Sequence, residues 1–130
     1  MSNPLRGEVW RADLGMVGKR RPVLVLSVPV NDVERDLVTV VERTTSDRPG
    51  SRFEVRDTLS SDDSGVFDAQ QIITVPRRKL QQRLGALTSE QLANVETAVK
   101  RWLGLQPLAP QPRMPRGGRV IDLGPGTGEI

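Results

Sequence analysis

The sequence predicts a small, mainly β (α+β) domain closed by one C-terminal helix. Short runs of β-branched and other apolar residues are separated by turn-forming Gly and Pro, which is typical of strands. One segment, 88–104, instead places apolar residues at helical spacing between a capping box and a glycine. Short strands with tight turns favour a partly closed antiparallel barrel.

The first two strands are expected at 7–14 and 21–28. Residues 7–14 alternate apolar with polar side chains, as a half-buried strand does. Residues 21–28 contain the continuous apolar run Val23–Leu26, which favours a strand that is buried on both faces. The Gly-rich segment 15–19 is expected to be the turn between them.

Three further strands are expected at 37–45, 52–56 and 66–75. Pro49 and Gly50 fit the central positions of a type II turn before the second of these strands. A polar loop covers 57–65. The segment 77–87 is ambiguous, and we expect a short helical turn followed by a strand over 83–87.

The helix has clear start and stop signals. Thr88 and Gln91 form a capping box, and Gly104 is a natural stop. The apolar stripe consists of Leu92, Val95, Val99, Trp102 and Leu103. We expect Trp102 to anchor the helix in the core.

Composition divides the chain into one domain, 1–105, and a Pro- and Gly-rich tail, 106–130, which we expect to be flexible or disordered. The tail ends in RVIDLGPGTGEI, which resembles the cofactor loop of S-adenosylmethionine-dependent methyltransferases. Such a loop works only when a helix follows the glycines. We therefore expect a flexible tail and no methyltransferase site.

Several function classes are disfavoured by composition. The chain has neither cysteine nor histidine, which excludes disulfides, thiolate zinc sites and a histidine base. There is no apolar stretch of ~18 residues, so we expect no membrane span. The start lacks the apolar region of a secretory signal, so we expect a cytoplasmic protein.

The net charge of +3 is too small to indicate a nucleic-acid partner, but the cations are clustered. Residues 19–21 and 77–79 each place three cations side by side, and such clusters can neutralise phosphates. If 21–28 and 37–45 are neighbouring antiparallel strands, Arg21 and Thr44 meet at one end of the sheet. A guanidinium and a hydroxyl can hold a phosphodiester. From the residues alone, an ordinary surface arginine and strand-end threonine remain the commoner interpretation.

The blocks RGEVWRADL, KRRPVLVLS, VTVVERTTS and AQQIITV, together with the closing helix and its LGL ending, resemble the MazF/PemK/Kid family. These are endoribonuclease toxins of bacterial toxin–antitoxin pairs. The resemblance covers about residues 5–105. It implies a CcdB/PemK-like fold, a small SH3-like barrel with a terminal helix.

The resemblance also implies a reaction that needs no metal and no cofactor. In it, the 2′-hydroxyl of single-stranded mRNA attacks the adjacent phosphate and leaves a 2′,3′-cyclic phosphate and a 5′-hydroxyl. Arg21 and Thr44 match the family's catalytic positions. The expected substrate-binding residues are Lys19, Arg20, Glu42, Thr45, Asp68, Gln70 and Gln71.

One departure from the family affects the general base. Gln70 stands where many relatives have an acid, and an amide cannot accept the proton. Asp68, which strand periodicity would place on the same face, and Glu42 are the replacements we consider.

The resemblance implies two protein partners, a second copy in a homodimer and a cognate antitoxin whose acidic tail occupies the RNA groove. The main alternative is a non-catalytic toxin of the same fold, like the CcdB branch, which binds DNA gyrase and cleaves nothing.

Overall fold

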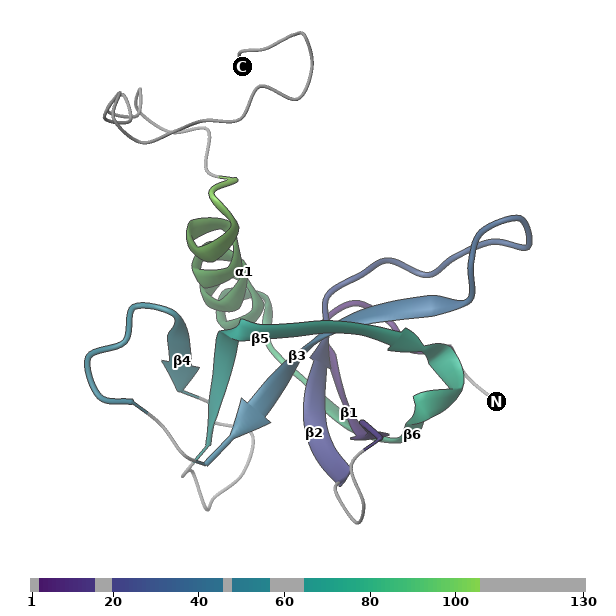
Figure 1. Cartoon of the computed structure of the whole chain (residues 1–130), viewed down its shortest axis with the longest axis horizontal. Coiled ribbons are helices and arrows are strands. Elements are labelled where there is room, and N and C mark those ends of the chain that lie inside the picture. The colour runs from purple at the N-terminus through teal and green to yellow at the C-terminus, as the bar shows by residue number, and fades with distance from the viewer. Residues whose placement is uncertain (1–2, 16–19, 46–47, 57–64, 106–130) are drawn as a thin grey trace, which may run out of the picture.

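The computed structural model describes residues 3–15, 20–45, 48–56 and 65–105. Six strands, one 3-10 turn and one α-helix follow one another along the chain (Figure 1). They are β1 (Glu8–Asp13), β2 (Arg20–Val25), β3 (Leu37–Thr44), β4 (Glu54–Arg56), β5 (Val66–Pro76), η1 (Arg77–Lys79), β6 (Leu80–Ala86) and α1 (Ser89–Leu103). The predicted mainly β domain with a C-terminal helix is confirmed.

All strands belong to one antiparallel sheet in the order β4-β5-β3-β2-β1-β6. The sheet is strongly curled, and α1 lies on one side of it (Figure 1). The central strand β2 has neighbours on both sides, and three consecutive residues in it, Val23, Leu24 and Val25, are fully buried. The prediction of a strand buried on both faces is therefore confirmed.

Alternation along the strands divides the core into two clusters. The inner cluster lies on the concave face and consists of Trp10, Ala12, Val23, Val25, Val38, Val40, Val75 and Leu80. The helix-side cluster consists of Val9, Leu24, Val41, Phe67 and Val95. Because successive strand residues point to opposite faces, the inner cluster identifies which side chains of β2 and β3 share one face.

The RGEVW segment fixes the start of β1 through polar contacts. Gly7 has φ +94°, and a Cβ built there would lie 3.3 Å from Leu92 of α1. One Glu8 carboxylate oxygen accepts hydrogen bonds from the Leu5 N–H and the Trp10 indole, each at 2.9 Å. The other accepts one from Arg83 of β6 at 2.9 Å. Burial alone would raise the pKa of Glu8, but these three donors hold it below its ordinary value.

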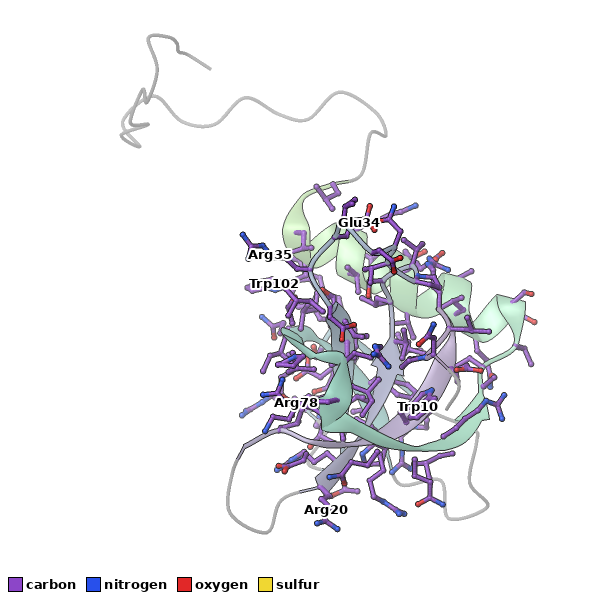
Figure 2. The ribbon with its side chains drawn as sticks, turned by 90° about the vertical axis from the view of Figure 1, so that its right-hand side faces the viewer. Trp10, Arg20, Glu34, Arg35, Arg78 and Trp102 are labelled. Atoms are coloured by element: carbon purple, nitrogen blue, oxygen red, sulfur yellow. The ribbon has the colours of Figure 1, made fainter. Side chains whose placement is uncertain are left out.

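The helix begins and ends at the predicted residues. The Thr88 hydroxyl accepts from the Gln91 N–H, and the Gln91 side chain accepts from the Thr88 N–H, each at 3.1 Å. Gly104 adopts the left-handed conformation at the C-terminal end. The prediction that Trp102 is a core anchor is wrong, because its side chain is 43% exposed (Figure 2). Its ring instead packs edge-on against the Phe53 ring, with the two ring centroids 5.3 Å apart.

Two strand boundaries differ from the predictions for identifiable reasons. β2 ends at Val25 because the N–H groups of Leu26 and Ser27 both approach the Thr39 carbonyl, which breaks the regular ladder. β6 begins at Leu80, earlier than predicted, because Leu80 pairs with Ala12 and joins the inner cluster.

Turn and loop predictions have different outcomes. The type II turn at Pro49–Gly50 is confirmed by a Ser51 N–H bond to the Arg48 carbonyl and by φ +89° at Gly50. Residues 16–19 of the first turn, residues 57–64 of the polar loop and the whole tail 106–130 lie outside the described residues. Within the described residues, no helix is both long and apolar enough to span a membrane.

Candidate active site

Arg21 and Thr44 lie at the same end of the sheet, on neighbouring strands. The β2–β3 register pairs Val25 with Val40 and Val23 with Glu42. Continuing that register by two residues on each strand aligns Arg21 with Thr44. The sequence predicted this meeting of Arg21 and Thr44 on the condition that the two strands are antiparallel neighbours, and they are.

Arg21, Glu42 and Thr44 also share one face of the sheet. Arg21 alternates with Val23 and Val25, and Glu42 and Thr44 alternate with Val40, all on the side of the inner cluster. Arg21 and Glu42 are half-buried, whereas Thr44 is only 8% exposed. The sheet thus brings together a guanidinium, a carboxylate and a hydroxyl.

The space around Arg21 is kept open by a small neighbour. Arg21 pairs with Ala12 of β1, which is fully buried. Directly opposite residues of an antiparallel pair lie on the same face. A methyl group therefore stands where a larger side chain would crowd the guanidinium.

Asp68, Gln70 and Gln71 lie in a pronounced bulge of β5. Between the pairs Val41–Ile72 and Arg43–Phe67, β3 contributes only Glu42 while β5 contributes Asp68–Gln71. Bulges of this kind bend a strand and redirect its side chains, and they are frequent next to active sites. The bulge therefore lies beside Glu42.

A buried carboxylate holds the bulge in shape. Asp68 is 7% exposed, and one of its oxygens accepts from the Gln70 N–H at 2.9 Å. The other accepts from the Gln71 side-chain amide at 3.0 Å. Gln70 and Gln71 themselves are exposed. The bulge breaks strand alternation here, so the burial of Asp68 and Gln70 differs, contrary to the shared face expected from periodicity.

The two candidate bases are therefore in different situations. Both oxygens of Asp68 already accept hydrogen bonds from the bulge. The Glu42 side chain makes no hydrogen bond or ion pair with another residue in the described ranges. Its carboxylate is half-buried, so it is accessible from the inner face at the end where Arg21 lies.

The remaining predicted residues lie at the border of this arrangement. Arg20 begins β2 and Thr45 follows β3, and both are exposed. Lys19 lies outside the described residues. No cluster of three or more acidic side chains that could hold a metal ion occurs in the part of the chain that the structure describes.

Arg43 is a neighbour of the site that sequence reasoning did not single out. It is half-buried on β3, between Glu42 and Thr44, and its guanidinium lies directly against Gly65. A Cβ at residue 65 would overlap that guanidinium. The signal in the sequence was Gly65, which directly precedes β5. Only the β3–β5 pairing shows why a glycine is needed there.

The fold and this site define a class of small, curled β domains with a terminal helix and a polar strand end. Several solved toxins have the same fold. A mycobacterial endoribonuclease, solved with its cognate antitoxin, is 31% identical and has a TM-score of 0.68; the match covers 84% of this chain and 99% of that chain. A MazE–MazF complex from Deinococcus radiodurans is 25% identical with a TM-score of 0.69, covering 82% and 100%.

A third similar structure is the Mycobacterium tuberculosis toxin MazF-mt6, which is 27% identical with a TM-score of 0.65, covering 76% of this chain and 98% of that chain. The family model described as PemK-like, MazF-like toxin of type II toxin–antitoxin system matches residues 5–103. The chain belongs to this family, whose members are endoribonucleases.

Proposed function

We propose that this chain is the toxin component of a type II toxin–antitoxin system and cleaves single-stranded mRNA at specific sequences in the cytoplasm. The observation that carries the proposal is the shared face of Arg21, Glu42 and Thr44 at one end of β2 and β3. Cleavage of messages would stop translation and growth.

The reaction is an internal transfer at phosphorus. The 2′-oxygen forms a bond to phosphorus, the bond to the 5′-oxygen breaks, and a 2′,3′-cyclic phosphate and a 5′-hydroxyl result. A base takes the 2′-hydroxyl proton, and the leaving 5′-oxygen takes up a proton. Charge grows on the phosphoryl oxygens in the transition state, where a fixed cation is most effective.

The residues divide these tasks. Arg21 stabilises the phosphoryl oxygens and donates a hydrogen bond toward the leaving oxygen. Thr44 positions the phosphate, with Thr45 beside it. Glu42 accepts the 2′-hydroxyl proton, because its carboxylate is not committed to a contact within the described residues. Gln70 and Gln71 present amides that hydrogen-bond the bases or sugars of the substrate.

The test is cleavage of a long single-stranded RNA in excess EDTA. Arg21→Ala should reduce the cleavage rate by about 10²–10³-fold, as loss of one oxyanion-stabilising donor does. Arg11→Ala is the matched control, because Arg11 lies on the neighbouring β1 and is exposed. Equal rates in the two variants would refute the role of Arg21.

A second candidate function is supported by Gln70, which replaces the acid of many relatives. A toxin of this fold without a working base could act by binding DNA gyrase. Wild-type protein that leaves several long RNAs intact but inhibits gyrase supercoiling would favour this alternative.

Two protein partners complete the proposal. A cognate antitoxin would cover the site with an acidic tail, and a second copy would form a homodimer. The similarity to toxins solved with antitoxins supports the first partner. Light scattering of the purified chain, alone and with the antitoxin, measures both.

A further inference from the structure

The two basic clusters of the sequence meet at one groove. The first includes Arg20 at the start of β2, and the second forms η1. A hollow of ≈ 600 Å³ lies between them, and Arg20, Arg77 and Arg78 line it together with Pro4, Trp10, Leu80 and Gln81. None of the described residues that line this hollow is acidic. We call it the basic groove.

The cations of the basic groove differ in availability. Arg20 and Arg78 are exposed, and neither has an ion-pair partner among the described residues. Both project outward from the body of the protein (Figure 2). Two unpaired guanidinium groups beside an apolar floor of Trp10 and Leu80 form a surface that attracts phosphates.

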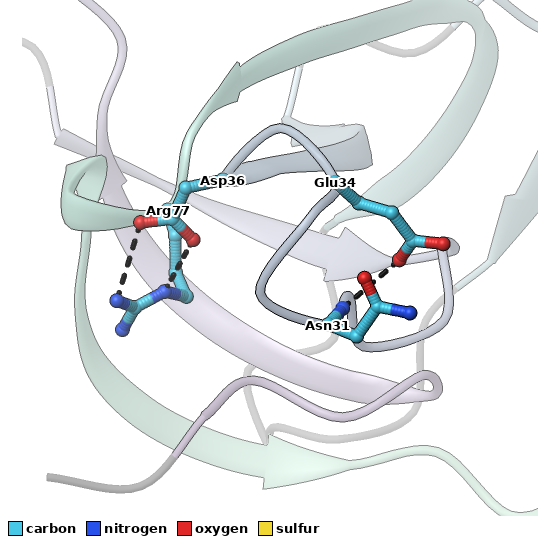
Figure 3. Close-up of polar contacts among 4 residues, drawn as sticks. All are labelled: Asn31, Glu34, Asp36 and Arg77. Carbon is cyan, nitrogen blue, oxygen red and sulfur yellow. Dashed lines mark hydrogen bonds and ion pairs between the residues drawn. The ribbon is translucent and has the colours of Figure 1, made fainter.

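Arg77 has a structural task instead. Its Nε and one terminal nitrogen bind the two carboxylate oxygens of Asp36 at 2.7 and 3.2 Å (Figure 3). The Asp36 carboxylate raises the pKa of Arg77 further. This two-point contact ties η1 to the loop before β3. It thereby fixes the position of Arg78, the next residue of η1.

A second hollow on the other side of the Arg77–Asp36 pair has the opposite character. Asp32, Glu34 and Asp36 line it. Glu34 accepts a hydrogen bond from the Asn31 N–H at 2.9 Å (Figure 3). Arg77 also lines this hollow and neutralises Asp36, which leaves Asp32 and Glu34 as its unmatched charges, so an anionic strand is favoured on the Arg78 side.

We propose that the basic groove binds the sugar-phosphate backbone of single-stranded RNA next to the cleavage site. This inference rests on the proposed function, because Arg20 directly precedes Arg21. Trp10 and Leu80, which form the floor of the groove, belong to the inner cluster, on the face of the sheet that Arg21 shares. Arg21 then serves the phosphate that is cleaved, while Arg20 and Arg78 hold the backbone that continues past it.

The experiment measures binding without cleavage, which keeps it separate from the test of catalysis. A fluorescent 2′-O-methyl oligoribonucleotide cannot be cleaved, because it lacks the attacking hydroxyl. Its affinity for the full chain is measured by anisotropy at several salt concentrations, for wild type, the double variant Arg20→Ala/Arg78→Ala and the single variant Arg78→Ala.

The expected effect follows from counterion release. Each phosphate contact to a single strand contributes about 0.7 to the slope of log affinity against log salt. The double variant should lose about 1.4 from the slope and bind roughly 25-fold more weakly at 0.1 M salt, with the curves converging near 1 M. Arg78→Ala should lose about half of that slope.

Arg35→Ala/Arg48→Ala is the charge-matched control, because both arginines are exposed and neither lines the groove. Equal affinity and slope in the control and the double variant would overturn the proposal, as would absence of oligonucleotide binding by wild type. Binding of polyglutamate through Arg20 and Arg78 without oligonucleotide binding would overturn it in favour of an acidic protein partner. Wild type that binds but does not cleave ordinary RNA would overturn the proposed function alone.

Discussion

Substitutions of Asp68 test whether its carboxylate has a structural or a catalytic role. Asp68→Ala removes the acceptor of the Gln70 N–H and of the Gln71 amide, which lie 2.9 and 3.0 Å away. Gln71 is exposed, so water can replace its bond, whereas the backbone N–H loses a charged acceptor. We expect unfolding free energy to fall by about 2–3 kcal/mol.

Asp68→Asn keeps the shape of the side chain but cannot accept a proton. Its carbonyl oxygen can still accept from the Gln70 N–H, and its amide can donate to the Gln71 oxygen after that side chain rotates. We expect stability within about 1 kcal/mol of wild type and RNA cleavage within a few-fold. Asp68→Ala should lose most activity, because the bulge beside Glu42 loses its support.

The assay pairs urea unfolding with the initial rate of RNA cleavage. The matched variant is Glu42→Gln, which should cleave RNA at least 10²-fold more slowly with unchanged stability, because it removes the base. If Asp68→Asn unfolds like wild type but is as inactive as Asp68→Ala, then Asp68 is the base and the reasoning is refuted.

Three further changes test other parts of the account. Glu8→Gln should lower the free energy of unfolding by about 1–2 kcal/mol at neutral pH. Because the pKa of Glu8 is lowered in the folded protein, its carboxylate stabilises the fold above the ordinary pKa of 4.5, and this stabilisation is lost as the pH falls below that value. Urea unfolding from pH 7 to 3.5 checks this, and a difference from wild type that grows on acidification contradicts it. Gly7→Ala should lower the free energy of unfolding by about 1–3 kcal/mol, because φ at residue 7 is +94° and the added Cβ would lie close to Leu92. Thermal melting measures this effect, and an unchanged melting temperature would contradict it. Deletion of 106–130 should leave RNA cleavage unchanged, and lost activity would show that the tail takes part.

The fold could be predicted where local chemistry decides it. The run Val23–Val25, the capping box of Thr88 and Gln91, and Gly104 each specify a conformation through their own side chains or backbone. The β2–β3 pairing could be expected because consecutive strands often pair, whereas the β3–β5 and β1–β6 pairings join segments that are not consecutive. The meeting of Arg21 and Thr44 was accessible for the same reason.

The features that escaped prediction depend on distant parts of the chain. The bulge at Asp68–Gln71 interrupts the β3–β5 pairing between Val41–Ile72 and Arg43–Phe67, and simple alternation along the sequence does not reveal it. Trp102 is at helical spacing with core residues, yet its side chain is 43% exposed and packs against the Phe53 ring at the surface. The basic groove joins Arg20 to η1, which only the three-dimensional structure brings together.

The most direct test of the central claim is the chemistry of the RNA ends. Wild-type protein is incubated with a long single-stranded RNA in excess EDTA, and the fragments are offered to a polynucleotide kinase without phosphatase treatment. We expect fragments that accept phosphate at their 5′ ends and carry 2′,3′-cyclic phosphates, formed about 10²–10³-fold more slowly with Arg21→Ala. Fragments with 5′-phosphates, or RNA that stays intact, would contradict it.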